Sequence, residues 1–80
     1  MASAYKVAQT HDYRGLLCPL PVIKISKAIK TVQIGEIVEM LADDPGAPAD
    51  MRAWARQTGH TLLDSQAEVG VFRFYIRREK

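Results

Sequence analysis

Apolar residues recur at helical spacing between Pro19 and about Gln33. They form one stripe, and the lysines of the segment lie away from it. The stripe consists of Val22, Ile25, Ile29 and Val32. Pro19 suits the first helical position, because the N–H that proline lacks would have no intrahelical partner there. With Gly35 marking the exit, the pattern predicts one amphipathic helix.

A second helix is predicted from about Pro48 to Thr58. Its inner face would consist of Met51, Trp54 and Ala55. Gly59 comes directly afterwards and suits a C-cap, because glycine readily adopts the left-handed conformation that ends many helices. The segment before this helix, Asp-Asp-Pro-Gly at positions 43–46, is typical of a tight turn.

Four other segments are predicted to be strands. Residues 5–12 are mixed, whereas residues 36–42 are apolar on both faces, which indicates a strand inside a sheet. Residues 61–67 and 71–77 alternate on either side of a Val-Gly turn, which predicts a hairpin. In the last strand, the residues expected to face the core are Phe72, Phe74 and Ile76, and those expected to face outward are Arg73, Tyr75 and Arg77.

The order β-α-β-α-β-β favours a two-layer α/β (α+β) sandwich, in which a four-stranded mixed sheet carries both helices on one face. The opposite face of the sheet is expected to be open to solvent. Because the chain has 80 residues, we expect residues 1–80 to form a single domain, with residues 1–4 as a flexible tail.

Composition and charge narrow the class of protein. With 48% hydrophobic residues, the chain has the composition of an ordinary folded domain. Its net charge of +2 is too small to indicate nucleic-acid binding by itself. It has no apolar run long enough to cross a membrane, and its first residues lack the apolar core of a secretory signal. We therefore expect a cytoplasmic protein. The single cysteine fits a reducing compartment and excludes mechanisms that need a second thiol in the same chain.

The candidate chemistry lies in the segment Gly-Leu-Leu-Cys-Pro-Leu-Pro at positions 15–21. Cys18 is expected at about the N-cap of the first helix, where the positive end of the helix dipole favours an anion. This interaction is worth about 0.3–2 kcal/mol. It would lower the thiol pKa from its usual value of about 8.5, by an amount between a few tenths of a pH unit and about 1.5 pH units. Pro19 and Pro21 fix the backbone, and three leucines flank the sulfur.

These features predict a rigid sulfur atom that is presented to another protein. A hydrolytic site would need a base and an oxyanion hole, and Cys18 has no convincing base near it in the sequence. The alternative is that Cys18 is a small buried hydrophobe, as many free cysteines are. Its position at a helix start beside paired prolines favours the reactive interpretation.

Other polar residues have two interpretations each. Asp43 and Asp44 could pair for acid–base chemistry, but their position before Pro-Gly favours a turn. His11 and His60 share no compact ligand spacing with Cys18, so neither a metal site nor a cofactor is expected. Three basic residues either dock an acidic partner beside the cysteine or belong to a solvated face; they are Arg14, Lys24 and Lys27. The basic residues in and after the last strand either form a basic patch or are charges that discourage another strand from adding to the sheet edge; they are Arg73, Arg77, Arg78 and Lys80.

The pattern Asp12-x-x-Gly15-x-x-Cys18-Pro19-x-Pro21 resembles the signature of the TusA/SirA family of sulfur carriers. The similarity extends to the end of the chain, through Gly35, the run Ala42-Asp43-Asp44-Pro45, Asp50, Trp54, Gly59, His60 and the pattern Phe72-x-Phe74-x-Ile76. The resemblance implies the same β-α-β-α-β-β sandwich. It also implies that Cys18 accepts a sulfane sulfur as a persulfide and passes it on, with Gly15, Pro19 and Pro21 in supporting roles.

The resemblance also implies protein partners: a donor of the cysteine desulfurase or rhodanese type and an acceptor of the DsrE type. Family members feed tRNA thiolation, sulfur oxidation or cofactor biosynthesis, and the sequence leaves the pathway open. Leu20, a further candidate for docking, is neutral where some relatives have an acidic residue, so their partner choice cannot be carried over.

A sulfur carrier is the function that we favour. A nucleic-acid-binding module would use Tyr75 with Arg73 and Arg77 on the outer face of the sheet, but a single aromatic ring is a thin stacking platform. A regulatory or scaffolding domain would bind a partner through the loop 16–20 without chemistry. Direct contact with nucleic acid or with a membrane is not expected.

Overall fold

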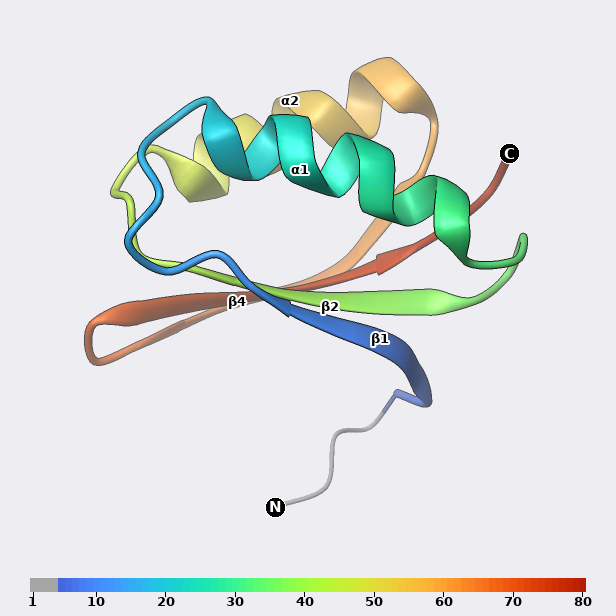
Figure 1. Cartoon of the computed structure of the whole chain (residues 1–80), viewed down its shortest axis with the longest axis horizontal. Coiled ribbons are helices and arrows are strands. Elements are labelled where there is room, and N and C mark those ends of the chain that lie inside the picture. Colours follow the sequence, from blue (N-terminus) through green and yellow to red (C-terminus); the bar gives the residue numbers. More distant parts are fainter. Residues whose placement is uncertain (1–4) are drawn as a thin grey trace.

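The computed structural model describes residues 5–80, so the predicted tail at residues 1–4 lies outside the described residues. Its elements follow the order β-α-β-α-β-β, with one short 3-10 turn after the first helix. Figure 1 shows both helices on one face of a four-stranded sheet. The predicted two-layer sandwich is therefore confirmed.

The first helix, α1, spans Leu20–Ala28 and continues as a 3-10 turn, η1, over Ile29–Thr31. Its predicted start is wrong by one position. Pro19 is the N-cap rather than the first helical residue, because its carbonyl accepts the first helical hydrogen bond, from Ile23 N–H at 3.1 Å. The helix also ends before Gln33, since the residue after η1 already has extended backbone angles.

The second helix, α2, spans Ala47–Thr58 and begins one residue earlier than predicted. It ends at Gly59, whose φ of 82° is left-handed and whose N–H donates to the carbonyl of Ala55 at 3.0 Å, so the predicted C-cap is confirmed. Within residues 5–80, no helix is long and apolar enough to cross a membrane.

Replacement of Gly59 by alanine is expected to lower the free energy of unfolding by about 1–2 kcal/mol, because a Cβ disfavours the left-handed conformation. The new Cβ would also meet the flexible end of the Lys80 side chain, which can move away. Thermal unfolding measures the effect as a melting temperature lower by roughly 4–8 °C per kcal/mol. Arg52→Ala, at an exposed position of α2, is the control and should change stability by less than about 0.5 kcal/mol. Equal stability of the two variants would contradict the expected strain.

The sheet has the spatial order β1-β2-β4-β3. β1 (Val7–Asp12) pairs in parallel with β2 (Ile37–Ala42), and α1 supplies the crossover that a parallel pair requires. β4 (Val71–Arg77) pairs antiparallel with β2 and with β3 (Thr61–Glu68). Because β1 and β2 are parallel, the loops that lead from them into α1 and α2 leave the same edge of the sheet.

The core lies between this sheet and the two helices. The sheet and both helices contribute fully buried side chains. They include Val38, Met40, Phe74 and Ile76 from the sheet, Ile25 from α1 and Met51 from α2. Ile29 of η1 is 1% exposed. Trp54 of α2 is also buried, at 4% exposure. The core-facing stripes predicted for both helices and for β4 are therefore confirmed, since Val22, Ala55 and Phe72 pack against this cluster as partly buried residues.

The sheet face opposite the helices is less open than predicted. Tyr75 does lie on this face, but it is only 5% exposed, and the ring of Tyr5 lies 4.9 Å from it between centroids. Glu39 stands opposite Tyr75 in the pairing of β2 with β4. Its Oε2 accepts hydrogen bonds from the Tyr75 hydroxyl at 3.0 Å and from Arg73 Nη1 at 2.6 Å. The Tyr75 ring is thus packed against the Tyr5 ring and its hydroxyl is bound to Glu39, so the aromatic platform expected of a nucleic-acid-binding face is not presented.

Candidate functional site

Cys18 is exposed in the loop that joins β1 to α1. The loop is tied to the neighbouring loop before α2, because Gly15 N–H donates to Asp43 Oδ1 at 2.9 Å. Gly15 has a φ of 85°, a conformation that glycine adopts without the strain of a Cβ. On the other side of the cysteine, Leu20 N–H donates to the carbonyl of Leu17 at 2.8 Å. The sulfur is thus held at the edge of the sheet from which both helices start.

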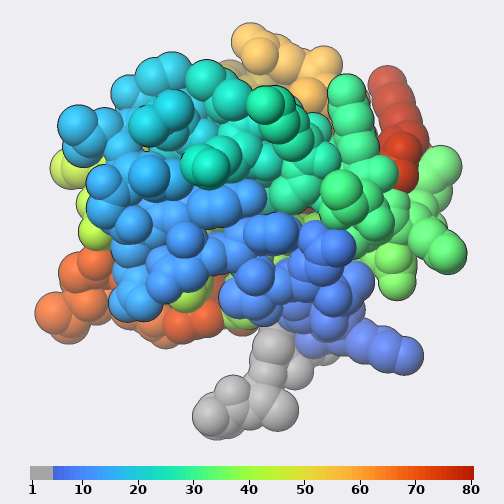
Figure 2. Space-filling view, in the orientation of Figure 1, coloured from blue at the N-terminus to red at the C-terminus, as the bar shows by residue number. Residues whose placement is uncertain are grey.

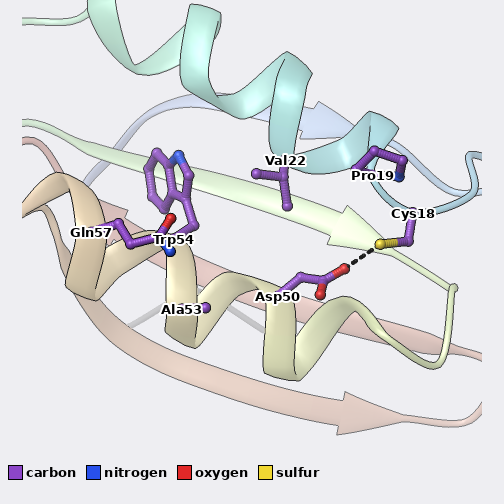
Figure 3. A pocket seen from close by; sticks show the side chains of 7 residues that line it. All are labelled: Cys18, Pro19, Val22, Asp50, Ala53, Trp54 and Gln57. Carbon is purple, nitrogen blue, oxygen red and sulfur yellow. Dashed lines mark hydrogen bonds between the residues drawn. The ribbon is translucent and has the colours of Figure 1, made fainter.

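The Cys18 thiol donates a hydrogen bond to Asp50, with 2.6 Å between Sγ and Oδ2 (Figure 3). Asp50 lies in the first turn of α2 and is 32 positions away along the chain. The sequence has no base close to Cys18 along the chain, but the fold brings the carboxylate of Asp50 to it. Asp50 is a matching position in the family pattern, and this match is the one signal in the sequence that points to it.

The environment raises the pKa of the Cys18 thiol, whereas the sequence predicts a lowered one. The largest cause is the hydrogen bond to Asp50, followed by desolvation and by the negative charges of Asp50 and Asp44. Two features of the structure explain the error. Cys18 precedes the N-cap, Pro19, so its sulfur does not cap the helix. A thiolate would also face the Asp50 carboxylate, and two like charges in contact disfavour the ionised form.

A shallow hollow of about 210 Å³ opens beside the sulfur, between α1 and α2 (Figure 3). Its lining consists of Cys18, Pro19, Val22, Asp50, Ala53, Trp54 and Gln57. The Trp54 ring is fixed there because its Nε1–H donates to Ser26 Oγ at 2.8 Å. The hollow has room for additional atoms on Cys18, and Asp50 is its one charged wall.

Apolar side chains are exposed on the surface around the cysteine. Leu17 is 70% exposed, and Leu20 and Ile23 are 45% and 46% exposed. Pro21, in contrast, is buried and anchors the first turn of α1. Figure 2 shows that β1, the following loop and α1 together form much of one face of the molecule. The exposed side chains of Leu17, Leu20 and Ile23 are available to a partner.

The basic candidates do not gather around the sulfur. Arg14 pairs with Asp12 at 2.6 Å between Nη2 and Oδ2, and its hydrogen bonds lower the pKa of Asp12 to about 2. Lys24 and Lys27 line a separate hollow, together with His11, Tyr13, Ala28 and Thr31. None of these three basic residues lines the hollow beside Cys18.

The remaining polar candidates have structural contacts. Asp44 Oδ2 accepts the Gly46 N–H at 2.9 Å, which supports the turn interpretation for Asp44, whereas Asp43 accepts the Gly15 N–H of the neighbouring loop. His60 Nδ1 accepts the Glu79 N–H at 3.1 Å, and burial lowers the pKa of this histidine. In the part of the chain that the structure describes, no group of three or more potential ligands is placed to hold a metal ion.

A family model described as "Sulfurtransferase TusA" matches residues 9–78, nearly the whole chain. The chain belongs to the TusA family. This match confirms the resemblance drawn from the Cys-Pro-x-Pro segment and from the later positions of the pattern. It includes both loops that meet at Cys18, so the site lies within the region that defines the family.

Named relatives of the TusA family support the same assignment. The chain is 43% identical over 72 residues to a protein of Neisseria meningitidis that is provisionally named a sulfur carrier protein, covering 90% of this chain and 97% of that one. It is 39% identical over 70 residues to the sulfur carrier protein TusA of Allochromatium vinosum, covering 88% and 92%. A crystal structure of a SirA-like protein from Desulfitobacterium hafniense has a TM-score of 0.76 at 26% identity, covering 90% of this chain and 99% of that one.

Proposed function

We propose that Cys18 accepts a sulfane sulfur as a persulfide and delivers it to an acceptor protein in a sulfur relay. The observation that carries this proposal is the sole cysteine of a TusA-family chain, exposed at the rim of a hollow that has room for a second sulfur. Gly15, Pro19 and Pro21 are positioning residues in this proposal, because they define the loop that holds the sulfur.

Loading follows the logic of thiol–disulfide exchange. The Cys18 sulfur attacks the outer sulfur of a donor persulfide, and a new S–S bond forms on Cys18. The S–S bond of the donor breaks, its electron pair goes to the inner sulfur of the donor, and that sulfur takes up the proton that Cys18 loses. Cys18–SH and R–S–SH thus become Cys18–S–SH and R–SH, and no external oxidant is consumed.

Protein partners fit this chemistry better than free small molecules. Leu17, Leu20 and Ile23 are exposed beside the sulfur, and such apolar residues bury well against another protein. We propose a donor of the cysteine desulfurase or rhodanese type and an acceptor of the DsrE type. A relay through a single thiol suits the reducing cytoplasm, and it could supply tRNA thiolation, sulfur oxidation or cofactor biosynthesis.

The relay is tested by following sulfur out of the loaded protein. The chain is loaded with radiolabelled sulfur, separated from the donor and mixed with a cysteine-containing acceptor peptide. We expect the label to move to the peptide in a form that reductant releases, while the protein returns to its original mass. A label that stays on the protein until reductant is added would contradict the proposed relay.

One observation favours a second candidate, a regulatory domain that binds partners through the loop 16–20 without chemistry. The hydrogen bond to Asp50 keeps the Cys18 thiol protonated, which slows its attack on a donor. The two candidates differ in their dependence on the thiol. Full cellular function of a Cys18→Ala variant would favour the regulatory domain, and loss of function with intact partner binding would favour the carrier.

A further inference from the structure

We propose that Asp50 is the proton relay of sulfur delivery: it takes the proton from the outer sulfur of the Cys18 persulfide and returns it to Cys18 Sγ as the acceptor removes that sulfur. This inference rests on the proposed function and adds a second reacting side chain to it. It is carried by the direct contact between Asp50 and Cys18 and by the hollow that both residues line.

The carboxylate of Asp50 is in direct contact with the sulfur. Its Oδ2 lies 2.6 Å from Cys18 Sγ, and among residues 5–80 its carboxylate forms no ion pair with an arginine or lysine. It lies in the first turn of α2, where the helix dipole is positive and an acidic side chain stabilises the helix. Asp50 is thus a proton acceptor in contact with the atom that must lose and regain a proton.

The hollow gives the outer sulfur a place beside this carboxylate. A persulfide extends one bond beyond Sγ, and the space next to Sγ is bounded by Val22, Ala53 and Trp54 with Asp50 as its charged wall. These apolar walls exclude water from one side of the sulfur, which strengthens its interaction with the carboxylate. In this position the outer S–H can donate to Asp50, as the thiol does in the unloaded protein.

Delivery requires the outer sulfur to be electrophilic. A deprotonated persulfide carries negative charge on that sulfur and repels an incoming thiolate, whereas a protonated one accepts attack. The charged groups that face Cys18 are Asp50 from α2 and Asp44 from the loop before it, and both are acidic. Their charges raise the pKa of the thiol, and by the same physics they extend the pH range in which the persulfide stays protonated.

In the delivery step, the outer sulfur passes from Cys18 to an acceptor thiolate. The acceptor thiolate, R–S⁻, attacks the outer sulfur, the new S–S bond forms on the acceptor, and the S–S bond to Cys18 breaks with its electron pair going to Sγ. The outer proton passes to Asp50, and Asp50 protonates Sγ. Cys18–S–SH and R–S⁻ become Cys18–SH and R–S–S⁻, so Asp50 ends ionised and the leaving sulfur departs as a neutral thiol rather than as a thiolate beside two carboxylates.

Asp50→Asn tests this relay, because asparagine keeps the shape of the side chain but cannot carry the proton. Each protein is loaded with inorganic polysulfide, and cyanide then removes the outer sulfur as thiocyanate. We expect Asp50→Asn to release thiocyanate about a hundredfold or more slowly than the wild type near neutral pH, a typical loss for a missing general acid–base group. In the same variant, the pH midpoint for alkylation of unloaded Cys18 should move downward, because a neutral asparagine replaces the carboxylate that stabilises the thiol.

Asp44→Asn is the matched control, since it removes an equal charge near Cys18 but no hydrogen bond to the sulfur. It should shift the alkylation midpoint downward by a smaller amount and slow thiocyanate release far less than Asp50→Asn does, because general acid–base transfer needs hydrogen-bond contact. Asp50→Glu should recover part of the lost rate, since it restores a carboxylate. This recovery also separates proton transfer from a merely structural effect of the substitution.

Release by Asp50→Asn at the wild-type rate and with the wild-type pH profile would overturn the relay. Equal slowing in Asp44→Asn and Asp50→Asn would overturn it as well, because charge alone would then explain the effect. A wild-type protein that takes up no sulfur in the loading step would refute the proposed function itself, and the relay with it. Normal loading with unchanged release in the variant would refute the relay alone.

Discussion

Replacement of Cys18 by serine is expected to abolish sulfur loading and to leave the fold intact. The chain has one cysteine, so no other thiol can hold a persulfide. Cys18 is exposed, and a serine hydroxyl can donate to Asp50 as the thiol does, so the free energy of unfolding should change by less than about 0.5 kcal/mol. Cyanide-released sulfur after treatment with inorganic polysulfide measures the loading, and thermal unfolding measures the stability.

Leu17→Ala is the control for this prediction. Leu17 is 70% exposed and one position from Cys18, so its truncation alters the surface of the loop without touching the sulfur. Because inorganic polysulfide needs no docking surface, this variant should load as the wild type does. Loading of Cys18→Ser above background would mean that sulfur binds elsewhere on the chain and would remove the basis of the account.

Replacement of Phe74 by alanine is expected to have the largest effect on stability. Phe74 is completely buried at the centre of β4, and its truncation leaves a cavity between the sheet and the helices. Such substitutions cost about 3–5 kcal/mol. A chain of this length has a total stability of about 4–12 kcal/mol, so the variant should lose a large part of it and unfold at a much lower urea concentration than the wild type. Urea unfolding followed by the fluorescence of Trp54, the only tryptophan, measures the change.

Val69→Ala provides the comparison within the same hairpin. Val69 is fully exposed in the turn between β3 and β4, so its truncation creates no cavity and should change the free energy of unfolding by less than about 0.5 kcal/mol. A Phe74→Ala variant within about 1 kcal/mol of the wild type would mean that the site collapses around the smaller side chain, contrary to a tightly packed core.

The parts of the fold that depend on local periodicity can be predicted from the sequence. Ile25 and Ile29 share one helical stripe, Met51 and Trp54 share another, and all four are buried as their spacing indicates. Gly59 ends α2 for a reason that is equally local, because the left-handed cap favours glycine. The helix boundaries shift by up to a few residues, since capping depends on which carbonyl accepts the first hydrogen bond, and the first strand begins at Val7 rather than at residue 5.

Contacts between distant segments explain what the sequence does not predict. Cys18 meets Asp50 only because β1 and β2 are parallel and the loops that follow them leave the same sheet edge. The Tyr75 hydroxyl donates to Glu39 because the two residues lie opposite each other in the register of two strands that are far apart along the chain. The sign of the change in the Cys18 pKa follows from the first of these contacts, which local helix-dipole reasoning cannot include.

The most direct test of the account is the intact mass of the protein after incubation with a cysteine desulfurase and cysteine. We expect a gain of one sulfur atom, located on the peptide that contains Cys18 and lost on treatment with reductant. No gain with any of several donors, from a protein whose Cys18 still reacts with a small alkylating agent, would contradict it. The thiol would then be accessible without carrying sulfur.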